Sequence, residues 1–133
     1  MNVIASYLTS ITGSSNYFSS GIISYSNESK IKLLNVSSKI LDKFGEVSEP
    51  VAKEMALGSM KIADSDIALS ITGYFESLTA VGAIQTELTG KVCFGIATIS
   101  GVKTYTHYFL GTRESIRQSS CEVSLNLVLD ILS

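Results

Sequence analysis

The chain is 133 residues long, which is enough for one folded domain and too short for two of ordinary size. With 45% apolar residues, 17% charged residues and a single proline, the composition excludes a disordered chain, because such chains are poor in aliphatic residues and rich in charge. The formal net charge is −2 and no basic block is present, so we expect no nucleic-acid partner. The sequence predicts one domain over residues 1–133.

The cysteines and the single histidine do not indicate a metal site. Cys93 and Cys121 each lie in an apolar periodic segment, where a free thiol usually behaves as a small hydrophobic side chain, so both are predicted to be reduced core residues. Zinc needs more ligands than these two and His107 supply, and we expect no cofactor. The start has no basic signal-peptide region, and no apolar stretch is long enough to cross a bilayer. We therefore expect a cytoplasmic protein without a membrane partner.

Hydrophobic periodicity and turn residues predict eight elements in the order α-β-α-α-β-β-β-α. In chain order these are a helix over 3–11, a strand over 17–26, a helix capped by Ser26 or Asn27, a helix capped by Ser48, a strand over 66–72, two hairpin strands that flank Gly101 (91–100 and 102–110) and a helix capped by Thr112. A short turn that ends at Gly45 separates the second and third helices. The apolar positions predicted to line these helices include Ile31, Leu33, Leu34, Val51, Met55, Ile62, Ile116, Val123, Leu127 and Ile131.

The strands are apolar enough to be covered on both faces, and the helices are long enough to cover them. We therefore predict an α/β fold, a three-layer α/β/α sandwich with a mixed sheet of four to five strands. In such folds ligands bind where strands end and helix amino termini point inward, because those amides and the helix dipole favour negative charge.

The stretch ISYSNESK, residues 23–30, is a corner of this kind. It places Tyr25 at the end of a predicted strand and Lys30 about one turn into the next helix. The helix dipole there opposes an ammonium by about 0.3 to 1 kcal/mol and so favours the free amine. A partly buried Lys30 could accept the proton of a hydroxyl nucleophile, with Tyr25 donating a hydrogen bond beside it.

Simpler interpretations of the same residues remain open. Lysines in first helical turns are commonly exposed and inert, Tyr25 could be a half-buried strand aromatic, and Asn27 could serve only as a cap. Thr72 and Gly73 end the predicted strand over 66–72 and could form a backbone nest for an anion, although a Thr-Gly pair is a weak signal alone.

Three stretches carry a resemblance to a known family: TGSSNYFSSGIISYSNESKIKLLNVSSKIL, then FGEVSEPVAKEMALGSMKIADSDIALSITG, and LGTRESIRQSSCEVSLNLVLDIL. They resemble the carboxyl-terminal domain of the competence/damage-inducible CinA family, whose members include nicotinamide-nucleotide amidases. The resemblance covers roughly residues 3–73 and 90–132. Its most specific pieces are YSNESK, LLNV and GEVSEPVA, in the family's order and spacing.

The resemblance implies deamidation of nicotinamide mononucleotide to nicotinic acid mononucleotide with release of ammonia, a step of pyridine-nucleotide salvage that uses no metal. A serine hydroxyl would attack the carboxamide, with a lysine as its base. Carried over to this chain, the candidate catalytic residues are Lys30 and Tyr25, and the candidate substrate-binding residues are Ser26, Asn27, Thr72 and Gly73. The partners implied are a small-molecule mononucleotide and a second copy of the chain, as a homodimer.

Two departures from the family pattern affect the expected activity. The family's serine belongs to a Glu-Ser-Cys-Thr-Gly-Gly stretch after a first strand, and Met1 and Asn2 stand where that stretch would finish. After Gly73 the family has a glycine- and proline-rich segment, and this chain has YFESLTAVGAIQTEL. We therefore expect a degenerate amidase-like domain that lacks the first strand and the nucleophile motif. A start assigned downstream of the true one, and a non-catalytic nucleotide-binding or homo-oligomeric assembly module, are the alternatives.

Overall fold

The computed structural model of the chain describes Ser10, Gly13 and residues 20–24, 26–77 and 88–132. The elements within these residues are α2 (Asn27–Leu34), α3 (Ser38–Phe44), α4 (Glu49–Ala63), β1 (Ile67–Ser77), β2 (Leu88–Thr98), β3 (Gly101–Gly111) and α5 (Arg113–Leu132). The predicted helix over 3–11 lies outside them except for Ser10. Residues 20–24, the described part of the strand predicted over 17–26, form no strand.

The described strands form one antiparallel sheet in the order β1-β2-β3. The predicted hairpin at Gly101 is confirmed, since β2 and β3 pair from Thr98 opposite Gly101 to Leu88 opposite Gly111. A mixed sheet of four to five strands is not confirmed, because the described residues supply three strands and all of them are antiparallel. The central strand β2 is buried along most of its length, which explains its nearly continuous apolar run.

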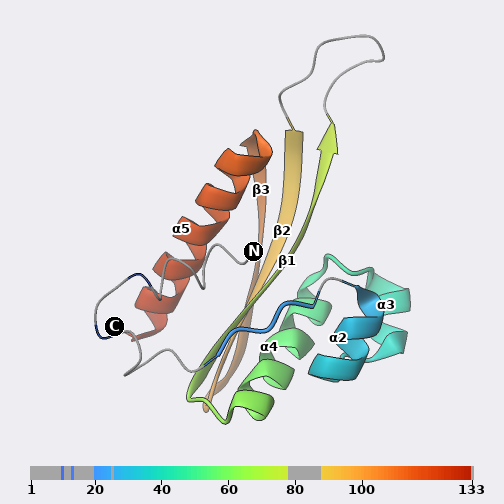
Figure 1. Cartoon of the computed structure of the whole chain (residues 1–133), viewed down its shortest axis with the longest axis vertical. Coiled ribbons are helices and arrows are strands. Elements are labelled where there is room, and N and C mark those ends of the chain that lie inside the picture. The colour runs from blue at the N-terminus through green and yellow to red at the C-terminus, as the bar shows by residue number, and fades with distance from the viewer. Residues whose placement is uncertain (1–9, 11–12, 14–19, 25, 78–87, 133) are drawn as a thin grey trace.

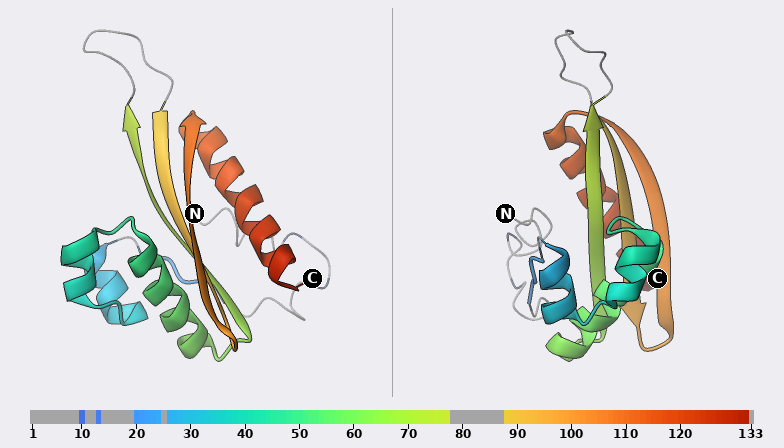
Figure 2. Two further views of the ribbon diagram at one scale, coloured as in Figure 1. Left: turned by 180° about the vertical axis from the view of Figure 1, so that it is seen from behind. Right: turned by 90° about the vertical axis from the view of Figure 1, so that its right-hand side faces the viewer.

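Helices cover the sheet on both faces (Figure 1). The α4 helix packs against all three strands on one face, and α2 and α3 pack on α4, whereas α5 lies on the opposite face. The helices are staggered along the sheet: α5 runs beside its upper part and α4 beside its lower part (Figure 2). The described residues therefore form an α/β fold with three layers, and the upper part of the α4 face carries no helix.

The helices begin where the sequence predicts. Three predicted caps accept a hydrogen bond from the backbone N–H three residues later: Ser26 from Ser29 (3.1 Å), Ser48 from Val51 (3.4 Å) and Thr112 from Ser115 (3.0 Å). The caps satisfy amide groups that have no partner inside the helix, so they fix the first turn of α2, α4 and α5. A further cap was predicted at Ser37 or Ser38; Ser37 does precede α3, but its side chain forms no capping hydrogen bond.

A glycine in the central strand lets α4 lie close to the sheet. A Cβ atom at Gly95 would lie 2.5 Å from the Ala52 carbonyl oxygen and 2.7 Å from the Ser70 hydroxyl. The Ser70 hydroxyl donates to that same carbonyl across the helix–sheet contact. Any side chain at Gly95 would push α4 away from β2 and break this hydrogen bond.

The predicted core positions are partly correct. Leu34, Val51, Met55 and Ile116 are buried as predicted, and Cys93 and Cys121 are buried and free. Ile31, Leu33 and Ile62 were predicted to be buried and are exposed, because the buried side of α2 carries Lys30 and Leu34, and that of α4 carries Val51, Ala52, Met55 and Ala56. The buried side of α5 contains Ser120, Cys121 and Ser124, whose small side chains replace the aliphatic stripe expected from Val123, Leu127 and Ile131.

Candidate functional site

The amino terminus of α2 holds the candidate general base. Lys30 is the fourth residue of α2, one turn from the Ser26 cap, as the sequence predicts. Its side chain is buried at 5% exposure, on the same side of the helix as Leu34. Leu34 anchors that side in a hydrophobic cluster with Val36, Val51 and other buried residues of α3 and α4. Packing of α2 on α4 therefore removes Lys30 from solvent.

The Lys30 amine has few partners among the described residues. Its Nζ donates one long hydrogen bond, 3.5 Å, to the backbone carbonyl of Ser24, and no described carboxylate forms an ion pair with it. By contrast, Lys32, two residues further on, is exposed and forms an ion pair with Glu28 at 2.7 Å. Burial of an ammonium without a counter-ion costs free energy, so such a position is unusual for a lysine with only a structural role.

The other candidates from the same motif lie around this helix start. Ser26 is exposed, and its hydroxyl is hydrogen-bonded to the Ser29 hydroxyl at 2.9 Å as well as to the Ser29 amide. Asn27 is the first residue of α2 and is exposed, so its side-chain amide faces solvent beside the helix amino terminus. Tyr25 lies outside the described residues.

Thr72 and Gly73 do not end a strand, contrary to the prediction. β1 continues to Ser77, and Thr72 and Gly73 lie opposite Cys93 and Val92 of β2. Their backbone groups lie within the antiparallel ladder, so the predicted backbone nest is wrong. The buried Thr72 hydroxyl donates to the Glu46 carbonyl at 2.8 Å and thus holds the loop before α4 against the sheet.

The structure adds a polar cluster that the sequence did not indicate. Glu49, at the start of α4, reaches the edge strand β3, where its two carboxylate oxygens accept hydrogen bonds from Thr104 (2.7 Å) and Thr106 (2.6 Å). The Thr106 hydroxyl also lies 3.5 Å from the Cys93 thiol. The threonines are 55 and 57 residues away in the chain, so only the folded sheet brings them to Glu49.

The cluster favours the charged form of Glu49. The hydrogen bonds from Thr106 and Thr104 hold the pKa of the Glu49 carboxyl below its ordinary value, and the positive charge of Lys91 adds to this against the opposing effect of burial. For the buried thiol of Cys121, on α5 at the opposite face of the sheet, the shift is the reverse, since burial and the charge of Glu122 raise its pKa. Cys121 therefore stays a protonated core thiol, as predicted.

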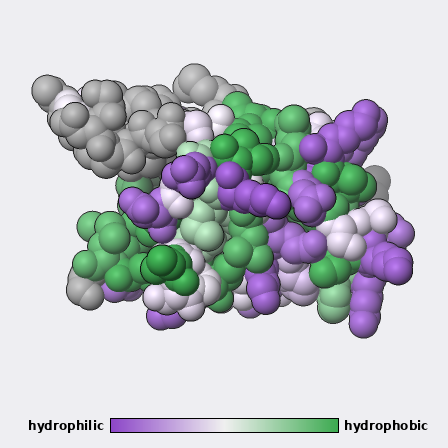
Figure 3. Space-filling view, turned by 90° about the horizontal axis from the view of Figure 1, so that it is seen from below, coloured by the Kyte–Doolittle hydropathy of each residue, from purple (hydrophilic) through white to green (hydrophobic). Residues whose placement is uncertain are grey.

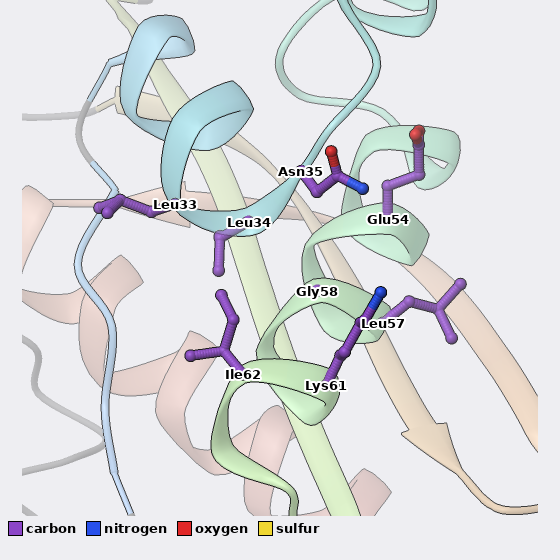
Figure 4. Close-up of a pocket in the computed structure, with 8 residues that line it drawn as sticks. All are labelled: Leu33, Leu34, Asn35, Glu54, Leu57, Gly58, Lys61 and Ile62. Atoms are coloured by element: carbon purple, nitrogen blue, oxygen red, sulfur yellow. The ribbon is translucent and has the colours of Figure 1, made fainter.

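A shallow groove lies between α2 and α4 (Figure 4). It has a volume of about 590 Å³ and is lined by Leu33, Leu34, Asn35, Glu54, Leu57, Gly58, Lys61 and Ile62. The side chains of Leu34 and Ile62 point toward each other across it. Seen from below, the molecule carries hydrophobic side chains in several patches separated by hydrophilic ones (Figure 3), so apolar surface is not confined to this groove.

The described residues do not group metal ligands. No cluster of three or more His, Cys, Asp or Glu side chains is found in residues 20–24, 26–77 and 88–132. The described helices also include none that is long and apolar enough to cross a membrane.

The comparison with known families agrees with this arrangement of helices and strands. A model of the CinA C-terminal domain matches residues 3–132. This chain belongs to the CinA family. A CinA-like protein from Endomicrobium trichonymphae is 41% identical to it over 125 residues, which cover 94% of this chain and 28% of that protein. The chain spans less than a third of the length of the curated relatives that it matches.

Solved CinA structures share the fold. A competence-damaged protein (CinA) superfamily protein from Escherichia coli superposes with a TM-score of 0.84 and 27% identity, over 96% of this chain and 73% of that one. A competence or damage-inducible protein from Enterobacter asburiae gives a TM-score of 0.85 and 27% identity, over 98% of this chain and 80% of the other. The architecture of this CinA domain is therefore that of its solved relatives.

Proposed function

We propose that this chain is a degenerate nicotinamide-nucleotide amidase-like domain. The reaction of this class converts nicotinamide mononucleotide and water into nicotinic acid mononucleotide and ammonia. Membership of the CinA family supports the reaction class. The observation that carries the proposal is the position of Lys30, which is 5% exposed, lies one turn from the start of α2 and has no described ion-pair partner. A lysine amine in such surroundings suits a general base for a hydroxyl nucleophile.

In the proposed reaction, Lys30 removes the proton from a serine hydroxyl as its oxygen bonds to the carboxamide carbon. The carbon–nitrogen bond then breaks, and the nitrogen leaves as ammonia with the proton returned by Lys30. Water hydrolyses the resulting ester, which releases the acid and restores the serine. The 133-residue sequence has no Glu-Ser-Cys-Thr-Gly-Gly stretch, so we expect this sequence alone to bind the nucleotide without turning it over.

The remaining candidates have distinct proposed roles. Asn27 and Ser26 would contact the substrate beside the amino terminus of α2, where amides and the helix dipole favour a negatively charged group. Thr72 would act by positioning the Glu46 loop, because its hydroxyl is already used there. Gly73 is exposed and has no side chain, so it would leave room for the substrate next to Thr72.

The test restores the serine and then removes the lysine. The 133-residue chain is fused behind a strand that ends in Glu-Ser-Cys-Thr-Gly-Gly, and ammonia release from nicotinamide mononucleotide is measured. We expect turnover by the fusion, and we expect Lys30→Met to lower kcat by at least about 100-fold, as for loss of a general base. Lys32→Met is the matched control, because Lys32 lies on the same helix but is exposed.

Two results would contradict the proposal. A folded fusion that binds the nucleotide but releases no ammonia would exclude the amidase reaction. Equal turnover by the Lys30→Met and Lys32→Met fusions would exclude Lys30 as the base. Circular dichroism of each variant separates these outcomes from a failure to fold.

A further inference from the structure

Consecutive backbone amides fix the link between α2 and α3. The Asn35 amide donates to the last turn of α2, and the Val36 amide donates to the carbonyl of Lys30 itself, each at 3.1 Å. The next amide, that of Ser37, donates to a side chain of another helix, the carboxylate of Glu54 in α4, at 3.0 Å. The backbone of the candidate base is therefore connected to α4 through two adjacent amides of this link.

Glu54 satisfies an amide at the start of α3 that this helix leaves without a local partner. Ser37 precedes α3, and its own side chain forms no capping hydrogen bond. A buried N–H without an acceptor costs free energy, and a carboxylate is a stronger acceptor than a neutral group. Glu54 is 17 residues further along the chain, so only the packing of α4 places its carboxylate at this amide.

The second carboxylate oxygen of Glu54 is buried and has no hydrogen-bond partner among the described residues. No described cation forms an ion pair with this side chain either. A buried carboxylate oxygen without a partner costs free energy, so a gain in stability is a poor explanation for an acid at this position. Its bond to the Ser37 amide, which fixes the geometry of the link, explains the acid better.

Glu54 and Gly58 lie one turn apart on the same side of α4. Gly58 allows close contact with the carbonyl of Leu34, just before the link, and Glu54 holds Ser37 just after it. Figure 4 shows Glu54 and Asn35 together at one end of the groove. Since α2 has eight residues and is about 12 Å long, anchoring its carboxyl end also fixes the depth of its first turn.

We infer that Glu54 is a positioning residue for the general base of the proposed reaction. Its carboxylate fixes the Ser37 amide, and the adjacent Val36 amide then holds the Lys30 carbonyl. The Lys30 side chain is thereby kept buried. The role of Lys30 as the base rests on the proposed function, whereas the position of its amine is measured without any reaction.

Labelling of the 133-residue chain with acetic anhydride, followed for each lysine by mass spectrometry, tests this role. Glu54→Met keeps the length of the side chain and removes the acceptor, and we expect Lys30 to be acetylated about tenfold faster in this variant. Glu54→Gln keeps an acceptor oxygen for the Ser37 amide, so acetylation of Lys30 should stay within about twofold of the parent. Lys53, which is exposed beside Glu54, should be acetylated at the same rate in all three proteins.

Ser70→Ala is the matched control for a general loss of stability. It removes the hydrogen bond from β1 to the Ala52 carbonyl, on the side of α4 that faces the sheet. It should lower the free energy of unfolding, measured by urea denaturation, without faster acetylation of Lys30. Acetylation of Lys30 as fast in Ser70→Ala as in Glu54→Met would overturn the positioning role. Equal rates in a folded Glu54→Met and in either the parent or Glu54→Gln would also overturn it.

The fusion that carries the serine supplies a kinetic readout. We expect Glu54→Met to lower kcat about tenfold with KM nearly unchanged, and Glu54→Gln to retain the parent kcat, because the base is displaced while the substrate-binding groups stay in place. If the fusion releases no ammonia, the amidase reaction is excluded and the labelling alone decides the role of Glu54. If ammonia release depends on Lys30 but Glu54→Met changes neither acetylation nor kcat, the positioning role is wrong and the amidase stands.

Discussion

Glu49 joins two layers of the domain through a single carboxylate. It begins α4, and both of its oxygens accept hydrogen bonds from threonines of the edge strand β3. Hydrogen bonds to a charged acceptor are stronger than those between neutral groups, and a carboxylate at a helix amino terminus also interacts favourably with the dipole. Glu49 therefore holds the first turn of α4 on the sheet.

Replacement of this carboxylate should make stability less dependent on pH. The pKa of Glu49 is lowered in the folded protein from its ordinary value of 4.5, so its charged form stabilises the fold at pH values above that value. This stabilisation is lost as the pH falls through the lowered pKa. We expect Glu49→Gln to reduce the free energy of unfolding at pH 7 and to differ less from the parent at pH 3, measured by urea denaturation.

Glu46→Gln provides the control for this experiment, because Glu46 is exposed and lies only three residues earlier. It should leave the free energy of unfolding nearly unchanged at both pH values. If the free energies of unfolding of the parent and Glu49→Gln differ as much at pH 3 as at pH 7, the charge of Glu49 does not stabilise the fold.

The sequence indicated some of these side chains and not others, for a physical reason. Lys30 was placed one turn into α2 by a local cap signal, and the structure has it there. Its burial depends on the packing of α2 on α4, and the partners of Glu49 come from a strand 55 residues away. Local patterns report helix ends and periodicity, whereas long-range contacts depend on how the elements pack.

The contact between α2 and α4 depends on a glycine. Gly58 lies in the middle of α4, where glycine normally costs about 1 kcal/mol relative to alanine. Here a Cβ atom would overlap the carbonyl oxygen of Leu34, the last residue of α2. The end of α2 is further fixed by Asn35, which takes the left-handed conformation (φ 56°) and donates its amide back to the last turn.

We therefore expect Gly58→Ala to destabilise the domain, although the same change in an exposed helix would stabilise it. Relief of the overlap requires α2 to move from α4, and overpacking of this kind costs about 1 to 3 kcal/mol, more than the gain in helix propensity. Urea denaturation measures the change. The Gly58→Ala substitution should also expose Lys30 in the folded protein, which would be detected as faster chemical acetylation of that residue.

Ser59→Ala, one residue further along α4, is the matched control for an alanine in this helix. It should change the free energy of unfolding by less than about 0.5 kcal/mol, because Ser59 is only partly buried. Stabilisation by Gly58→Ala would contradict the tight contact between the helices.

The elements also differ in how well the sequence predicts them. The start of α4 was predicted by a serine cap and a proline in the first turn, and the hairpin by Gly101 between two apolar runs; both are confirmed. The predicted strand over 66–72 is five residues too short at its end, because Gly73 was taken as a stop and instead pairs with Val92. Pairing with a neighbouring strand satisfies the backbone of that glycine and overrides its low strand preference.

At the scale of the whole molecule, the long edge strands predict self-association. Among the described residues β1 and β3 each pair only with β2, so each offers one side of 11 residues without a described strand partner. Exposed edges of this length tend to pair with another chain unless charged residues or bulges protect them. β3 has one lysine, Lys103, near its start, and its later residues Tyr108 and Leu110 are exposed.

We expect the chain to form a homodimer, in which symmetric contact between two copies covers one of these edges. Sedimentation velocity over a range of concentrations should give a mass twice the 14.2 kDa of one chain at high concentration. Because association stabilises the folded state by mass action, the melting temperature should rise with protein concentration. A mass of one chain and a constant melting temperature across that range would show instead that the sheet edges are protected within a single copy.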